Sequence, residues 1–159
     1  MSDIPLDRID RKILFELMQD TTLPVATLAE RVGLSQTPCW KRVQKLEAAG
    51  VIMRRVALVD PEKIGLGLTV FVEIEAADHT PDWRGAFAEI VADYSEVVEV
   101  HRMAGDVDYL LKVMVQDMAT FDEFYLEFTR RLPCRNVTSK FSMEVIRATT
   151  LLPIDTVTA

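Results

Sequence analysis

The sequence predicts an α+β protein with two parts, because the spacing of apolar residues changes from helical to strand-like along the chain. Between Pro24 and Ile52, apolar residues recur every three or four positions, as on one face of a helix. After Leu68, runs such as LTVFVEIEA alternate apolar and polar residues, as half-buried strands do. The intervening DPEKIGLG, with one proline and two glycines, is typical of a linker. We therefore expect a helical domain at residues 1–60, a linker at 61–67, an αβ domain at 68–152 and a tail at 153–159.

The first part is expected to contain three helices. Residues 6–19 predict a supporting helix with Asp7 as its N-cap and Asp10 in its first turn, where negative charge suits the helix N-terminus. The second helix ends at Gly33, which can adopt the left-handed conformation that terminates a helix. Ser35 then caps the third helix with its hydroxyl. Apolar stripes predict the buried faces of these last two helices: Val25, Leu28, Ala29 and Val32 on one, and Cys39, Val43 and Leu46 on the other.

Two short helices around a glycine corner, the second polar at its start and then basic, are typical of a helix-turn-helix whose second helix enters the DNA major groove. Residues 51–59 (VIMRRVALV) are β-prone and predict a basic wing. Gln and Thr suit base edges, whereas Lys and Arg suit phosphates or guanine. The candidate DNA-binding residues are therefore Ser35, Gln36, Thr37, Trp40, Lys41, Arg42, Gln44, Lys45, Arg54 and Arg55.

The distribution of charge supports this interpretation over an ordinary helical pair with surface lysines. The chain carries −7 overall, yet residues 1–60 hold nine basic and eight acidic residues, and residues 61–159 hold nine and seventeen. Residues 31–55 contain six basic residues and a single acidic residue, Glu47. A small basic patch on an acidic body fits a specific DNA binder with few phosphate contacts. Because one such patch binds weakly, we expect a homodimer that presents two.

The second part predicts strands at 68–76, 97–103, 109–115 and 137–147, and helices at 80–93 and 118–132. This order is βαβ repeated twice, which predicts a ferredoxin-like βαββαβ domain beside the winged helix-turn-helix. Both helices would then cover one face of the sheet. The other face would stay bare and favour self-association.

Catalytic patterns are lacking in the sequence. The chain has no GxGxxG, P-loop, nucleophile elbow or zinc-ligand spacing, so we expect no enzyme, metal or cofactor. Asp106 and Asp108 could bind a cation or act as acid and base, but Asp in a Gly-Asp turn commonly binds local backbone N–H groups. Cys39 is expected in the core, with a redox role as the alternative. Two distant cysteines and no signal or membrane-spanning segment predict a cytoplasmic protein.

Five segments together resemble the Lrp/AsnC family of leucine-responsive, or feast/famine, regulators. They are LDRIDRKIL (6–14), LAERVGLSQTPCWKRVQKLEAAGVI (28–52), DPEKIGLG (60–67), MAGDVDYLLKV (103–113) and FSMEVIRATTLLP (141–153). The forms TPCWKR, RMAGDVDYLL and FSMEVI are most similar to a subgroup containing a cysteine-detoxification activator. One departure is the Pro133–Cys134 junction, where relatives often have a Pro-Gly turn.

The resemblance implies a winged helix-turn-helix joined to an effector-binding domain whose sheets pair into dimers, which assemble into octamers. It implies a small amino acid, with cysteine as the first candidate, bound between dimers near the Gly-Asp-x-Asp turn. Ser139 stands near the sequence position at which many relatives have a threonine that contributes to the pocket. The effector-binding residues so implied are Met103, Gly105, Asp106, Asp108, Tyr109 and Ser139.

The sequence therefore predicts a sequence-specific, double-stranded-DNA-binding transcriptional regulator modulated by a small amino acid. The alternative is an amino-acid-sensing or enzyme-partner domain whose helix-turn-helix serves protein contacts.

Overall fold

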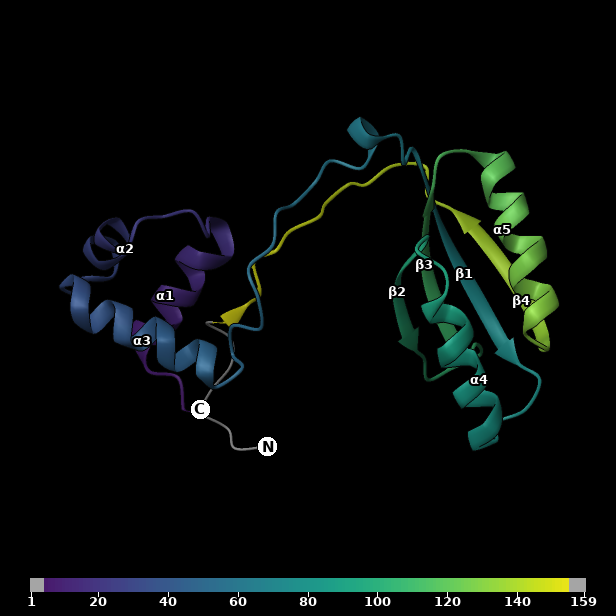
Figure 1. Ribbon diagram of the computed structural model, residues 1–159, viewed down its shortest axis with the longest axis horizontal. Coiled ribbons are helices and arrows are strands. Elements are labelled where there is room, and N and C mark those ends of the chain that lie inside the picture. The colour runs from purple at the N-terminus through teal and green to yellow at the C-terminus, as the bar shows by residue number, and fades with distance from the viewer. Residues whose placement is uncertain (1–4, 155–159) are drawn as a thin grey trace. The chain divides into compact units, whose positions relative to one another are not determined.

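The computed structural model describes residues 5–154, which form two compact units (Figure 1). Unit 1 comprises the chain up to Leu58 together with the segment from Ile146 onward, and unit 2 comprises Val59–Val145. These limits differ from the expected ones, because residues 146–152, assigned by sequence to the αβ domain, pack with the helical unit. Residues 1–4 of the expected helical domain and 155–159 of the expected tail lie outside the described residues.

Unit 1 is built on three helices: α1 (Arg8–Gln19), α2 (Val25–Val32) and α3 (Gln36–Ala48). Their core contains the predicted stripes of α2 and α3 together with Ile13, Leu14 and Leu17 of α1, while Val25 is only half-buried. Gly33 ends α2 with φ +77°, in the left-handed region, as predicted.

The caps of α1 and α3 differ in kind. Asp7 caps α1 and forms a reciprocal capping box with Asp10, whose carboxylate reaches back to the Asp7 backbone N–H. Ser35 occupies the N-cap position of α3, but its hydroxyl makes no capping hydrogen bond, contrary to the prediction. The first turn of α3 is instead closed by its backbone, where the Cys39 N–H donates to the Ser35 carbonyl oxygen at 3.2 Å.

The wing expected at residues 51–59 does not form a strand, so this prediction is wrong. Residues 53–60 are extended but have no strand assignment, because no other segment among residues 5–154 forms a ladder with them. High β-propensity cannot make a strand without a hydrogen-bonded partner.

The C-terminal segment adds a fourth piece to unit 1. The Thr150 hydroxyl donates to the Met18 carbonyl oxygen at 2.8 Å, and the Leu152 N–H contacts the Met18 sulfur at 3.4 Å. The Arg11 guanidinium donates to the Ile154 carbonyl oxygen, and the half-buried Ile154 side chain packs on the helical core. The helical unit is therefore assembled from both ends of the described chain.

Unit 2 has the predicted ferredoxin-like order. A 3-10 turn, Glu62–Ile64, precedes β1 (Leu68–Ala76), α4 (Pro81–Ala92), β2 (Val97–Arg102), β3 (Tyr109–Val115), α5 (Met118–Arg131) and β4 (Cys134–Phe141). The strands lie in the order β2-β3-β1-β4, and every pair is antiparallel. Strand β4 begins three residues earlier and ends six earlier than predicted. It ends there because it has reached the beginning of its antiparallel partner β1, and the Ser142 N–H makes the last bond, to the Thr69 carbonyl oxygen.

One face of the sheet is covered and the other is not. Val70, Val72 and Ile74 of β1 face the core, where aromatic side chains of α4 and α5 cover them. The opposite face carries ion pairs, such as Lys112–Glu99 at 2.9 Å, beside Phe71, which is 36% exposed. This bare face therefore mixes charge with apolar surface.

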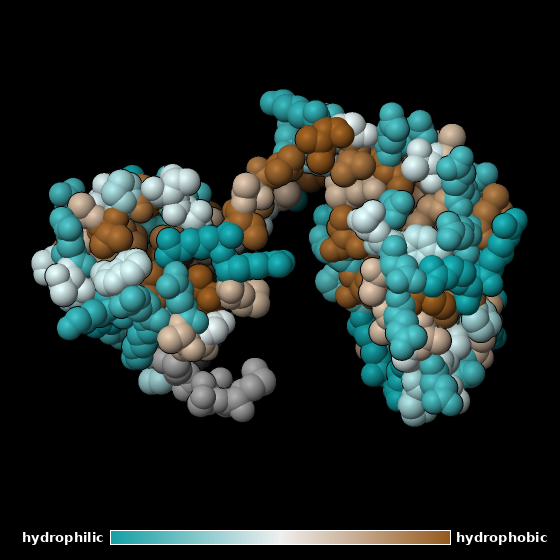
Figure 2. All heavy atoms as spheres, viewed as in Figure 1, coloured by the Kyte–Doolittle hydropathy of each residue, from teal (hydrophilic) through white to brown (hydrophobic). Residues whose placement is uncertain are grey.

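Large apolar side chains are also exposed on the segments that join the two units. Met53, Leu58 and Met143 are 89%, 77% and 94% exposed, and brown atoms mark parts of these segments in Figure 2. No helix among the described residues is long and apolar enough to span a bilayer.

Candidate DNA interface and effector site

Helix α3 has one buried and one solvent-facing stripe. Cys39, Val43 and Leu46 are at most 2% exposed, and they recur at the same spacing as Thr37, Lys41 and Gln44 on the other side of the helix. Trp40 (43% exposed) and Lys45 flank this outer stripe. The outer stripe and its two flanking residues thus offer hydrogen-bonding groups, an aromatic ring and two cations on one surface.

The N-terminus of α3 is open as well. Ser35, Gln36 and Thr37 are exposed, and the Ser35 hydroxyl is not used as a cap. Backbone N–H groups at a helix start lack intrahelical acceptors and attract anions. This end of α3 can therefore bind a phosphate or a base edge.

Arg42 is the exception among the predicted DNA-binding residues of α3. Its Nη1 lies 2.6 Å from Asp7 Oδ2 and 2.8 Å from Asp10 Oδ1, so its guanidinium is bound to the start of α1. These two carboxylates raise the pKa of Arg42, which stays charged. Because two carboxylates already match its charge, Arg42 is less available to DNA than the other predicted residues of α3.

The two arginines of the expected wing differ. Arg55 pairs with Glu47 at 2.9 Å, and both side chains are about 40% exposed. An exposed pair of this kind is weak and can exchange for a phosphate. Arg54 is exposed, with no ion pair among residues 5–154.

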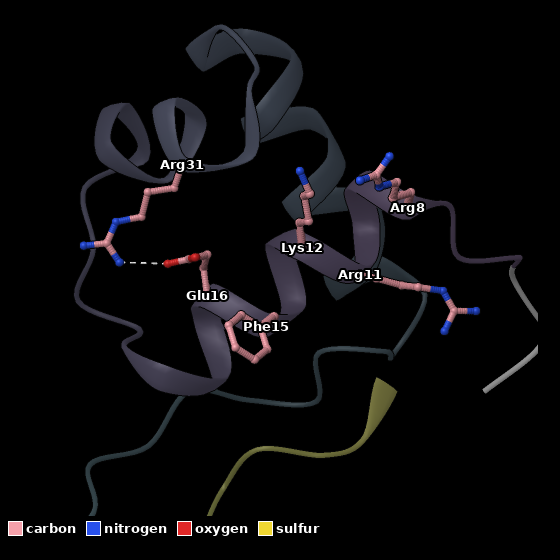
Figure 3. Close-up of a pocket in the computed structure, with 6 residues that line it drawn as sticks. All are labelled: Arg8, Arg11, Lys12, Phe15, Glu16 and Arg31. Carbon is pink, nitrogen blue, oxygen red and sulfur yellow. Dashed lines mark hydrogen bonds and ion pairs between the residues drawn. The ribbon is translucent and has the colours of Figure 1, made fainter. Parts of the chain in front are cut away.

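A second basic cluster, absent from the predictions, lines a hollow of about 430 Å³ on α1 and α2 (Figure 3). Arg8, Arg11, Lys12 and Phe15 of α1 line it, and Arg31 of α2 pairs with Glu16 at 2.7 Å. These α1 residues lie on the side of the helix away from Ile13 and Leu17, and so away from the core against which α3 packs. The cluster adds positive charge to unit 1 without belonging to the outer stripe of α3.

The predicted effector turn joins β2 to β3. The Met103 N–H donates to the Asp108 carbonyl oxygen at 2.8 Å and closes it, and Gly105 has φ +141°, a conformation rare for other residues. Met103, Gly105 and Asp106 are all exposed. Asp106 makes no hydrogen bond or ion pair within residues 5–154, so its carboxylate is available to a ligand.

Asp108 and Tyr109 hold this turn in place. The Asp108 carboxylate accepts a hydrogen bond from the Ala76 N–H at 2.8 Å, and its other oxygen lies 3.7 Å from His79 Nδ1. The Tyr109 ring, 8% exposed, packs at 4.3 Å from the Phe87 ring. Both were predicted to contact the effector, but the Tyr109 ring is in the core and one Asp108 oxygen binds backbone.

Ser139 lies elsewhere in the sheet. It pairs with Val72 on β4, the edge strand opposite β2, and is half-buried on the helix-covered face. Two strand spacings, about 10 Å, separate β4 from β3. A single chain does not bring Ser139 to the β2–β3 turn.

Residues 5–154 contain no group of three His, Cys, Asp or Glu side chains that could hold a metal ion. Cys39 is fully buried and Cys134 is half-buried, and burial raises the pKa of both thiols, that of Cys134 to about 11. The thiolate is the nucleophilic form, so neither site favours thiol chemistry.

Comparison with known proteins identifies both units. Residues 6–47 match the AsnC-type helix-turn-helix domain, and residues 69–152 match the Lrp/AsnC ligand binding domain. The chain belongs to the Lrp/AsnC family. Family members similar to it include the DNA-binding transcriptional activator DecR of Escherichia coli K12, with 50% identity over 151 residues, covering 94% of this chain and 99% of that protein.

Solved Lrp/AsnC structures share the fold. An AsnC family regulator from Agrobacterium tumefaciens has 54% identity and a TM-score of 0.90, covering 94% of this chain and 97% of that one. A Neisseria meningitidis regulator in complex with L-Met has 35% identity and a TM-score of 0.91, covering 95% and 98%. The chain is thus an Lrp/AsnC-type DNA-binding transcriptional regulator, with a neighbour that binds an amino acid.

Two features of this Lrp/AsnC chain were not predicted from its sequence. The position of Arg42 beside the buried stripe of α3 follows from helical spacing, but its partner does not, because Asp10 lies 32 positions away in another helix. The basic hollow had a signal, because Arg8, Lys12 and Phe15 recur at helical spacing.

Proposed function

We propose that the protein is a sequence-specific regulator that reads DNA with the outer stripe of α3 and responds to a small amino acid bound near the β2–β3 turn. The observation that carries the DNA part is the exposed stripe of Thr37, Lys41 and Gln44, flanked by Trp40 and Lys45. Polar groups that contact base edges would supply sequence specificity, and lysines that contact phosphates would supply affinity. Gln36 and the unused Ser35 hydroxyl add to this surface at the start of α3.

The proposed acting form is a homodimer that assembles into an octamer. One outer stripe together with the flanking Lys45 offers few phosphate contacts, and a second copy supplies a second half-site. The bare face of the sheet and the exposed apolar residues of the joining segments support self-association. The proposed location is the cytoplasm, where DNA is accessible, and no catalytic role is proposed.

The proposed effector is a small amino acid, with cysteine as the first candidate. The L-Met bound to the Neisseria meningitidis neighbour supports a sulfur amino acid as ligand class. In the exposed turn, the Asp106 carboxylate is suited to the α-ammonium group, and backbone N–H groups beside Gly105 suit the α-carboxylate. Met103, 40% exposed, offers an apolar contact for the side chain.

Another copy completes the proposed pocket. Within one chain, Ser139 and the β2–β3 turn lie on different edges of the sheet, so Ser139 can join the pocket only across an interface. Asp108 and Tyr109 contribute indirectly, because they fix the turn that presents Asp106.

Two measurements test the proposal. Gel shifts with DNA flanking the protein's own gene should show binding that weakens as salt rises, since phosphate contacts release counterions. Absent or salt-insensitive binding would instead favour a helix-turn-helix that serves protein contacts. Thermal-shift screening of the twenty amino acids should show stabilisation by the effector alone, and no shift with cysteine would exclude cysteine while leaving DNA binding intact.

A further inference from the structure

Arg42 joins the recognition helix to the supporting helix through one compact ion-pair cluster, defined by Asp7, Asp10 and Arg42. A single nitrogen, Arg42 Nη1, lies 2.6 Å from Asp7 Oδ2 and 2.8 Å from Asp10 Oδ1. The Asp10 side chain is 5% exposed, Arg42 is 32% exposed and Asp7 is 50% exposed. Asp10 is also the only polar residue in the buried set of residues 5–154.

The same carboxylates also build the N-terminus of α1. Asp7 Oδ1 accepts hydrogen bonds from the Ile9 and Asp10 N–H groups, both at 2.8 Å, and Asp10 Oδ2 accepts from the Asp7 N–H at 3.2 Å. Each carboxylate therefore uses one oxygen for the cap and the other for Arg42. Since the cap fixes the carboxylates, it also fixes where the guanidinium must lie.

The position of Arg42 on α3 explains why this matters for the outer stripe. Arg42 lies one turn from both Cys39 and Leu46, so it borders the buried side of α3. Its ion pairs constrain the rotation of α3 about its axis and its distance from α1. Rotation of α3 moves Thr37, Lys41 and Gln44 together relative to a DNA groove.

We infer that Arg42 is a positioning residue, which sets the orientation of the recognition helix through Asp7 and Asp10 and contributes no phosphate contact of its own. The inference rests on the proposed DNA-binding function. It predicts that a carboxylate, Asp10, promotes binding to a polyanion. Simple electrostatics predicts the reverse, because removing a negative charge near DNA should strengthen binding.

The test compares four single variants in the full chain: Arg42→Gln, Asp10→Asn, Lys45→Gln and Glu16→Gln. Binding to one DNA fragment is measured over a series of salt concentrations. We expect Lys45→Gln to reduce the slope of log affinity against log salt by about 0.9, the value for one lost phosphate contact. Arg42→Gln should weaken binding by about tenfold with the slope unchanged, a size common for coupled ion-pair networks.

The direction in which Asp10→Asn changes DNA affinity decides between the two roles of Arg42. If Arg42 positions α3, Asp10→Asn weakens binding, and the double variant with Arg42→Gln is no weaker than Arg42→Gln alone. If Arg42 contacts phosphate, Asp10→Asn frees it and strengthens binding, which would overturn the inference. Glu16→Gln is the matched control, since it removes the same charge from an ion pair with Arg31 of α2 and not from a pair with α3. It should leave binding unchanged or slightly tighter.

Folding is checked in the same samples by thermal melts. Removing one partner of a buried pair is costly, so Asp7→Asn and Arg42→Lys serve as milder variants. Asp7 is half-exposed, and Lys keeps the charge but loses the planar guanidinium. Both should weaken binding at an unchanged salt slope while the protein stays folded at the assay temperature, and tighter binding by folded Asp7→Asn would also overturn the inference. Absence of salt-dependent binding by the wild type would instead refute the proposed function. A slope lowered equally by Arg42→Gln and Lys45→Gln would refute this inference alone.

Discussion

The carboxylate of Asp108 accepts the backbone N–H of Ala76 at 2.8 Å, which ties the turn after β2 to the end of β1. The Asp108 N–H in turn donates to the Ile74 carbonyl oxygen at 2.9 Å, so one residue bonds twice to the same strand. Asp106, two residues earlier, is exposed and makes no such bond within residues 5–154. Two aspartates of one short turn therefore have separable roles.

Asp108→Ala should lower the free energy of unfolding by about 1–3 kcal/mol, because it leaves the Ala76 N–H without its acceptor. Chemical denaturation of the full chain measures this. Asp106→Ala is the matched control and should change stability by less than about 0.5 kcal/mol, as surface substitutions commonly do. Equal effects of the two substitutions would contradict the separation of roles.

Asp106→Ala should abolish the thermal stabilisation that the effector gives to the wild type. The reason is that Asp106 is the free carboxylate of the turn, and the α-ammonium group of an amino acid needs an anionic partner. The measurement is a thermal shift with the amino acid that stabilises the wild type. An undiminished shift would place the effector elsewhere.

Gln36→Ala and Thr37→Ala should change which DNA sequences are preferred, whereas Lys41→Ala should weaken binding to all sequences alike. A lost base contact relaxes discrimination by about 1–3 kcal/mol at one position, while a lost phosphate contact is independent of sequence. Selection from a randomised duplex pool, followed by competition binding, distinguishes the two. If all three variants select the same site with wild-type affinity, α3 is not the recognition helix.

Ile154→Ala should destabilise unit 1 by roughly 1 kcal/mol, because the half-buried Ile154 side chain packs on the helical core. Hydrogen exchange of the α1 amides reports this locally. Leu152→Ala is the control, since Leu152 is 66% exposed and its contact with Met18 is made by its backbone N–H. Equal α1 exchange rates in the two variants would show that Ile154 adds nothing to the helical core.

The Cys134 thiol should resist alkylation until strongly alkaline pH. Burial raises the pKa of Cys134 from 9.0 to about 11 in the folded chain. Stability linked to this thiol is therefore complete below pH 9 and is lost as pH rises through about 11, because the unfolded chain releases the proton first. Peptide-level mass spectrometry after iodoacetamide treatment should show a rate midpoint near 11, with Cys39 slower still. A midpoint near 9 would mean that Cys134 is exposed in solution.

Local pattern was sufficient to predict most elements. The limits of α4, β1 and β3 follow from caps and alternation within each segment, and Thr80 caps α4 by accepting from the Trp83 N–H. Long-range pairing was not predictable in this way. The extent of β4 depends on β1, and the role of Asp108 depends on Ala76, a residue 32 positions away.

The candidate site shows the same division. The outer stripe of α3 follows from helical period alone, whereas Arg42 is a basic residue whose partner lies in another helix. Ser139 was grouped with the β2–β3 turn, but strand order places it on the far edge. Charge type can be read from sequence, but which charges neutralise one another requires the tertiary structure.

The C-terminal contacts with Met18 and Arg11 have a consequence for biosynthesis. A ribosome completes all three helices of the DNA-binding unit long before it synthesises Thr150 and Ile154. Until then, part of the surface of α1 lacks the segment that packs on it. The last contacts of the helical unit therefore form only after the whole sequence of unit 2 has left the ribosome.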